Sequence, residues 1–111
     1  MEKNDFAYIE HILDSINKIE KYTDTINVYE FIDNELIQDA VIRNFEIIGE
    51  ATKNISNDFR NKYANISWKK MAGMRDILIH NYLGVDLYAI WETIEKELPK
   101  LKENLLDLYK T

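Results

Sequence analysis

The sequence has no cysteine, only one proline and three glycines among its 111 residues. Because cysteine is absent, disulfides and thiolate metal sites are excluded, and a reducing compartment is the natural assumption. No basic-then-apolar segment opens the chain, and no apolar run approaches about 18 residues, so nothing indicates export or membrane insertion. These absences predict a cytoplasmic protein without a membrane span.

Few helix breakers and regularly spaced apolar residues predict helices along most of the chain. Phe6 and Ile9 begin the first apolar face, with Asn4 or Asp5 as its candidate N-cap. The expected helices cover about 5–22, 27–33, 35–55, 68–84 and 86–108, with a kink or restart at Pro99 and a loop over 56–67.

The pattern contains no strand, repeat or linker, so it predicts one all-α domain over residues 1–111. We expect an antiparallel bundle of four to five helices. At 46% hydrophobic residues the chain can build a core, and a domain of this size often gains stability by dimerising.

The charge is unevenly distributed along the chain. The net charge is −6 overall, but residues 1–42 carry −7, residues 43–75 carry +4 and residues 76–111 carry −3. The overall sign argues against a general nucleic-acid coat, while the basic middle fits either a local anion site or ordinary helix surfaces.

The basic middle leads into the segment GMRDILIHNYLG, residues 73–84. On an ideal helix Met71, Met74 and Leu78 form a core stripe, and Arg75 lies at its edge. His80 lies on the opposite side, about 7.5 Å from Arg75 along the axis.

Small or apolar residues lie between and beside the two polar side chains. Ala72 and Ile79 separate Arg75 from His80, and Gly73 follows just beyond, so this face is smooth enough for a second protomer. A two-fold dimer would bring two Arg/His pairs into one cleft.

The two residue types suit RNA cleavage without a metal. A base takes the proton of the 2′-hydroxyl, an acid protonates the leaving 5′-oxygen, and a cation stabilises the phosphorane. Arg75 fits the cation and His80 the proton transfer. Structural roles fit the same residues, because Arg75 could pair with a carboxylate and His80 could cap a helix end.

Other polar and aromatic residues have simpler interpretations. We predict that His11 lies on the surface and that Trp68 and Trp91 lie in the core. Gly49, inside a predicted helix, costs about 1 kcal/mol relative to alanine and indicates a close approach of another backbone. Glu50 is either solvated or paired with an arginine. Two histidines without linked spacing predict no metal site and no cofactor.

The motif Arg75-x-x-x-x-His80-x-Tyr82 resembles the R-x-x-x-x-H-x-Y motif of HepT-like toxins, in the HEPN superfamily of helical ribonucleases. The resemblance extends to AVIRNFEIIGEATKNIS, WKKMAGMRDILIHNYLGVD and IWETIEKELPKLKENL, and is strongest over residues 40–106.

This resemblance implies a metal-independent endoribonuclease toxin that cleaves RNA, with tRNA as a candidate target, and acts as a homodimer with a composite site. Arg75 and His80 would be the catalytic pair, supported by Asp76 and Asn81, with Asp76 standing where the family usually has asparagine. Tyr82 would receive AMP from a separate nucleotidyltransferase antitoxin of the MntA type.

The residues themselves leave a second hypothesis open. A non-catalytic helical dimer could use the Arg75 face to hold a nucleotide or a nucleotidyltransferase partner without turnover.

Overall fold

The computed structural model describes the backbone of residues 2–80 and 86–110 and the side chains of residues 4–75 and 86–110. Within these residues the chain is helical and has no strand. The elements in chain order are α1 Glu2–Thr23, α2 Val28–Ile32, α3 Glu35–Lys53, α4 Asn57–Lys62, α5 Trp68–His80, α6 Leu87–Glu92 and α7 Leu98–Asp107. The predicted all-α bundle is therefore confirmed.

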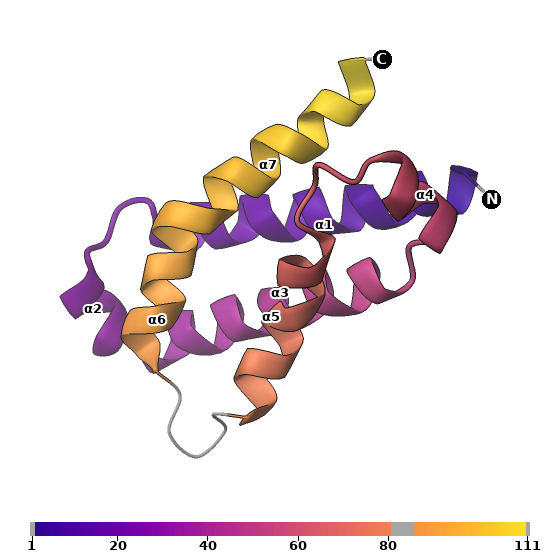
Figure 1. Ribbon diagram of the computed structural model, residues 1–111. Coiled ribbons are helices and arrows are strands. Elements are labelled where there is room, and N and C mark those ends of the chain that lie inside the picture. Colours follow the sequence, from indigo (N-terminus) through magenta and orange to yellow (C-terminus); the bar gives the residue numbers. More distant parts are fainter. Residues whose placement is uncertain (1, 81–85, 111) are drawn as a thin grey trace.

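Helices α1 and α3 lie side by side and run in opposite directions, and α5 packs across α3 (Figure 1). Helix α6 continues through a π-helical turn, Thr93–Glu97, into α7. Pro99 lies in the first turn of α7, which is one of the two positions expected for it. The four long segments of the bundle are thus α1, α3, α5 and the α6–α7 rod.

The core is mostly aliphatic and lies where the long segments meet. Isoleucines spaced three and four residues apart place one face of α1 wholly inside it. The fully buried apolar side chains, which come from the four long segments, α2 and the turn after α3, are Ile9, Ile12, Ile16, Ile19, Phe31, Val41, Ile48, Ile55, Met71, Leu98 and Leu105.

Side-chain caps begin several helices where the sequence offers the right residues. Asn27 and Glu30 form a capping box at α2, and Asn34 caps α3. The Asp86 carboxylate accepts a hydrogen bond of 3.0 Å from the Ala89 amide at the start of α6, as predicted.

The expectation that Asn4 or Asp5 caps α1 was wrong. Helix α1 already includes both residues, and the buried Asp5 carboxylate instead accepts hydrogen bonds from the Ser56 amide at 2.8 Å and the Ser56 hydroxyl at 2.9 Å. A carboxylate on one helix can satisfy the start of another, and sequence spacing does not reveal which helix end lies beside it.

The expected loop over 56–67 contains helix α4, which was also missed. Ser56 caps this short helix, and Phe59 anchors it in an aromatic cluster with Phe6, Tyr63 and Trp68. A helix this short is not stable by propensity alone, so the packing of Phe59 decides its formation.

The two chain ends lie at the same end of the bundle (Figure 1). The Phe6 and Tyr109 rings are 5.3 Å apart between centroids. Burial, and to a smaller extent the nearby Glu10 carboxylate, raises the pKa of the Tyr109 hydroxyl.

Candidate functional site

Helix α5 carries the predicted catalytic residues, and its first turn is firmly anchored. Its start at Trp68 agrees with the prediction, and the Trp68 indole N–H donates to the Tyr63 carbonyl at 3.0 Å. Met71 and Met74 are buried, as expected for the core stripe of this helix.

Gly49 lets α5 come unusually close to α3. A Cβ atom at Gly49 would lie 2.7 Å from the Arg75 Cβ, 3.0 Å from the Arg75 amide nitrogen and 3.3 Å from the Ala72 carbonyl oxygen. The backbone approach predicted at this glycine is confirmed, and the approaching element is the helix with Arg75.

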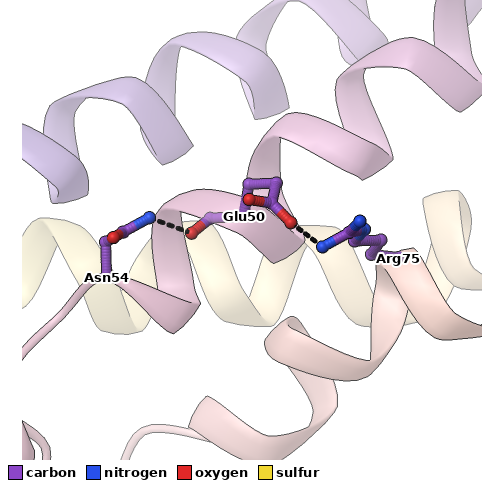
Figure 2. A network of polar contacts seen from close by, with 3 residues as sticks. All are labelled: Glu50, Asn54 and Arg75. Atoms are coloured by element: carbon purple, nitrogen blue, oxygen red, sulfur yellow. Dashed lines mark hydrogen bonds and ion pairs between the residues drawn. The ribbon is translucent and has the colours of Figure 1, made fainter.

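The close crossing brings Arg75 to Glu50, the residue after the glycine. Figure 2 shows the Glu50 side chain reaching from α3 to the Arg75 guanidinium on α5, where the two form a salt bridge. One turn further on, the Asn54 side-chain amide donates to the Glu50 carbonyl at 2.9 Å. Glu50 is therefore Arg-paired, which is one of its two expected states.

The salt bridge leaves Arg75 accessible. The side chains of Arg75 and Glu50 are 40% and 52% exposed, and an ion pair exposed to that extent contributes only about 0–1 kcal/mol. A phosphate with two anionic oxygens offers the guanidinium a fork-like partner of matching shape. Arg75 is thus oriented by a weak contact that a stronger anion can replace or share.

The other predicted site residues are placed only in part. Asp76, Ile79 and His80 belong to α5 by their backbone, and their side chains lie outside the described part of the chain. Asn81 and Tyr82 lie outside the described residues altogether. The structure therefore does not test the Arg75–His80 arrangement.

The described part of the small-residue face of α5, Ala72 and Gly73, is accessible among the described residues. Ala72 and Gly73 are partly exposed, and a Cβ atom at Gly73 would have no described atom within 4 Å. No described residue outside α5 thus contacts Gly73, and a second protomer remains its proposed partner.

Next to the Arg75–Glu50 pair lies a hollow of about 370 Å³ along the surface of α3. We call this feature the α1–α3 hollow. Its lining residues are Tyr8 and His11 of α1, Arg43, Glu46, Ile47, Glu50 and Ala51 of α3, Asn54 at the end of α3, and Arg75 of α5.

Sequence reasoning missed that His11 and Arg43 share a hollow with Arg75. His11 is exposed, as predicted, but it faces this hollow. A partial signal existed, because Arg43, Ile47 and Glu50 are spaced four and three residues apart and so share a helix face. The position of α1 beside that face could not be read from spacing.

Two searches of the described residues gave negative results. No group of three or more histidine or acidic side chains is arranged to hold a metal ion in the described part of the chain. None of the helices within residues 2–80 and 86–110 combines the length and apolarity needed to cross a membrane.

The fold and this site define a class: an all-α bundle with an accessible arginine on its third long helix. The comparison with known proteins goes one step further. The family described as Ribonuclease HepT-like matches residues 12–108, so the chain belongs to the HepT-like ribonuclease family. The predicted resemblance, which covers nearly the whole chain and is strongest over residues 40–106, is confirmed.

Several curated relatives support this assignment. A Methanocaldococcus jannaschii protein named "Gamma-glutamylcyclotransferase and putative RNase" is 51% identical, over 97% of this chain and 49% of that protein. A second protein of that organism, named "Putative RNase", is 45% identical over 95% of this chain and 97% of its own length. The "Probable ribonuclease HepT" of Thermococcus cleftensis is 45% identical over 92% of this chain and 93% of its own.

This chain therefore spans about half the length of the first of these relatives and nearly all of the other two. No solved structure matches the chain at a significant level.

Proposed function

We propose that this chain is an endoribonuclease toxin that cleaves RNA without a metal ion, in the cytoplasm, as a single domain over residues 1–111. The observation that carries the proposal is the accessible Arg75 side chain, which Glu50 of α3 orients through a salt bridge. Arg75 lies on α5, and the same helix reaches His80 five residues later. Membership of a ribonuclease family supports assigning these residue types to phosphodiester chemistry.

In the proposed reaction the 2′-oxygen of RNA attacks the adjacent phosphorus and the bond to the 5′-oxygen breaks. One His80 takes the 2′-hydroxyl proton, and the His80 of a second protomer donates a proton to the 5′-oxygen. Arg75 stabilises the phosphorane, and the products are a 2′,3′-cyclic phosphate and a 5′-hydroxyl end. DNA lacks the attacking hydroxyl and would not react.

The second protomer is part of the proposal because one histidine cannot easily serve both proton transfers in a single step. We propose a homodimer in which the face of Ala72, Gly73 and Ile79 packs against its copy. The open space at Gly73 among the described residues supports this choice of face.

We further propose that a separate nucleotidyltransferase antitoxin of the MntA type transfers AMP to Tyr82, with tRNA as one candidate RNA target. The added phosphate and base would block the cleft by charge and bulk. Asn81 and Asp76 would support the pair from either side of His80 in sequence. The Asp76 carboxylate would weaken phosphate binding unless it orients His80. Its pairing with Arg75 would have to compete with Glu50, which already forms a salt bridge with that arginine.

The test is RNA cleavage by the purified, unmodified chain in buffer containing a metal chelator. His80→Ala is expected to lower the cleavage rate by about 10²–10⁴-fold, the usual contribution of a positioned acid or base. Mass spectrometry of the fragments should find 2′,3′-cyclic phosphate ends.

A substrate control isolates the chemistry. Uniformly 2′-O-methylated RNA of the same sequence should bind and remain uncut, because its nucleophile is blocked. Equal cleavage by wild type and His80→Ala would refute the mechanism.

The Arg75–Glu50 pair also favours a second candidate, because a paired arginine is a common structural arrangement. In that case the chain is a non-catalytic dimer that binds a nucleotide or the nucleotidyltransferase. It would bind without turnover, and Arg75→Ala would lose binding. Growth arrest on expression of the chain alone, relieved by His80→Ala, would favour the ribonuclease.

A further inference from the structure

The α1–α3 hollow extends away from Arg75 along the surface of α3. Arg43 lies seven residues before Glu50 on that helix, which corresponds to about 10.5 Å along the axis. The hollow is large enough for a small ligand, since such sites start at about 300 Å³. A polymer whose phosphate lay on Arg75 would pass over this surface.

Arg43 differs from the other arginines of the described residues, because its guanidinium has no partner among them. Arg60 donates hydrogen bonds to the Ile55 carbonyl, and Arg75 pairs with Glu50. Arg43 is exposed and forms no hydrogen bond or ion pair with any other described residue. An uncommitted guanidinium beside a hollow is well suited to bind a phosphate.

Helix α1 forms the opposite wall with an imidazole and a phenol. His11 is exposed and lines the hollow, while Tyr8 is half-buried and packs against the core. An imidazole N–H can donate to a phosphate or a base, and the face of an aromatic ring can stack with a base. These groups suit a nucleotide better than a simple anion.

An acidic residue in the lining also favours a nucleotide over a simple anion. The half-buried Glu46 also lines the hollow, and its carboxylate would repel an isolated phosphate ion. In RNA, however, the 2′-hydroxyl and the base amino groups are donors that a carboxylate can accept. A lining with both signs of charge therefore fits a nucleotide within a strand.

We propose that the α1–α3 hollow binds the nucleotide of the RNA strand that neighbours the scissile phosphate, with Arg43 on its phosphate and His11 on the opposite wall. This inference rests on the proposed ribonuclease function, because Arg75 is taken to mark the reacting phosphate. Arg43 is a substrate-binding residue in this arrangement and takes no part in proton transfer.

The test measures the affinity of the full chain for a fluorescent 2′-O-methylated RNA oligonucleotide at several salt concentrations. Arg43→Ala should weaken binding about tenfold or more, as expected for one charge-assisted contact. It should also reduce the slope of log affinity against log salt by about 0.7, the value for one phosphate contact on a single strand. His11→Ala should weaken binding about fivefold, as for a single neutral hydrogen bond.

Lys100→Ala is the matched control. Lys100 is an exposed cation of α7 outside the lining of the hollow, so its removal changes the net charge equally. Affinity and salt slope should stay as in the wild type. Arg43→Lys should recover most of the salt slope, because a lysine keeps the positive charge that contacts the phosphate.

Three outcomes would overturn the inference. Unchanged binding by Arg43→Ala, or equal losses in Arg43→Ala and Lys100→Ala, would refute the subsite, while His80-dependent cleavage by the wild type would leave the ribonuclease function standing. A wild-type chain that neither binds nor cleaves RNA would overturn both together.

Discussion

Gly49 lies where α5 crosses α3, and its missing side chain sets the distance between the two helices. The nearest atoms to a Cβ at this position belong to Arg75 and Ala72, including backbone that cannot move independently. The next residue, Glu50, then reaches Arg75. At the scale of single residues, one absent side chain and one carboxylate position the proposed catalytic arginine.

Gly49→Ala is expected to destabilise the protein by about 1–3 kcal/mol, because the added methyl group would push α5 away from α3. Urea denaturation followed by circular dichroism measures this loss. The same change should lower RNA cleavage, since Arg75 moves with its helix.

Gly73→Ala is the matched control, because it is the same substitution in a helix interior without described atoms nearby. Within a single chain it should stabilise by about 0.5–1 kcal/mol. A loss at Gly73 would indicate that a partner subunit covers this face, whereas an unchanged stability of Gly49→Ala would contradict the close crossing.

At the scale of elements, the segment between α3 and α5 decides where α5 begins. Asp5 of α1 holds the Ser56 amide and hydroxyl, and Ser56 in turn caps α4. The Phe59 ring then contacts the Trp68 ring at the start of α5. Helix α4 is thus a connector that ties α5 to α1.

Asp5→Ala should cost about 1–3 kcal/mol of stability, because it leaves the Ser56 amide without its buried acceptor. Relative to the wild type, Asp5→Ala should accelerate amide hydrogen exchange more in α4 than in α3. Asp14→Ala is the matched control, since Asp14 forms only an exposed ion pair with Lys18. Similar losses in both variants would contradict the tether.

At the scale of the whole molecule, function as proposed depends on two further chains, a second protomer and the antitoxin. The described chain contributes one arginine, one hollow and an open small-residue face on α5. None of these completes a reaction with two proton transfers. Control by a partner that modifies Tyr82 would then act on the assembled cleft.

Co-production with a nucleotidyltransferase of the MntA type is expected to add one or more AMP-sized masses to the chain and to abolish RNA cleavage. Intact mass spectrometry measures the addition, and Tyr82→Phe should prevent it. Tyr88→Phe is the matched control, because Tyr88 is a nearby tyrosine with 60% of its surface exposed. Continued modification of Tyr82→Phe would refute this target.

The sequence by itself determined the helical class, most helix bounds and the family. These follow from local periodicity and from caps such as Asn34 and Asp86, whose partners lie three residues away. The pairing of Arg75 with Glu50 was one of two open alternatives, and the close approach at Gly49 was predicted without its partner.

Only the tertiary structure decided that Asp5 serves Ser56, that Glu50 meets Arg75, and that His11 lies across a hollow from Arg43. These contacts join residues 25 or more positions apart, or different helices, and depend on how the helices cross. Spacing along one helix fixes which face a residue occupies, but it does not fix which other helix covers that face.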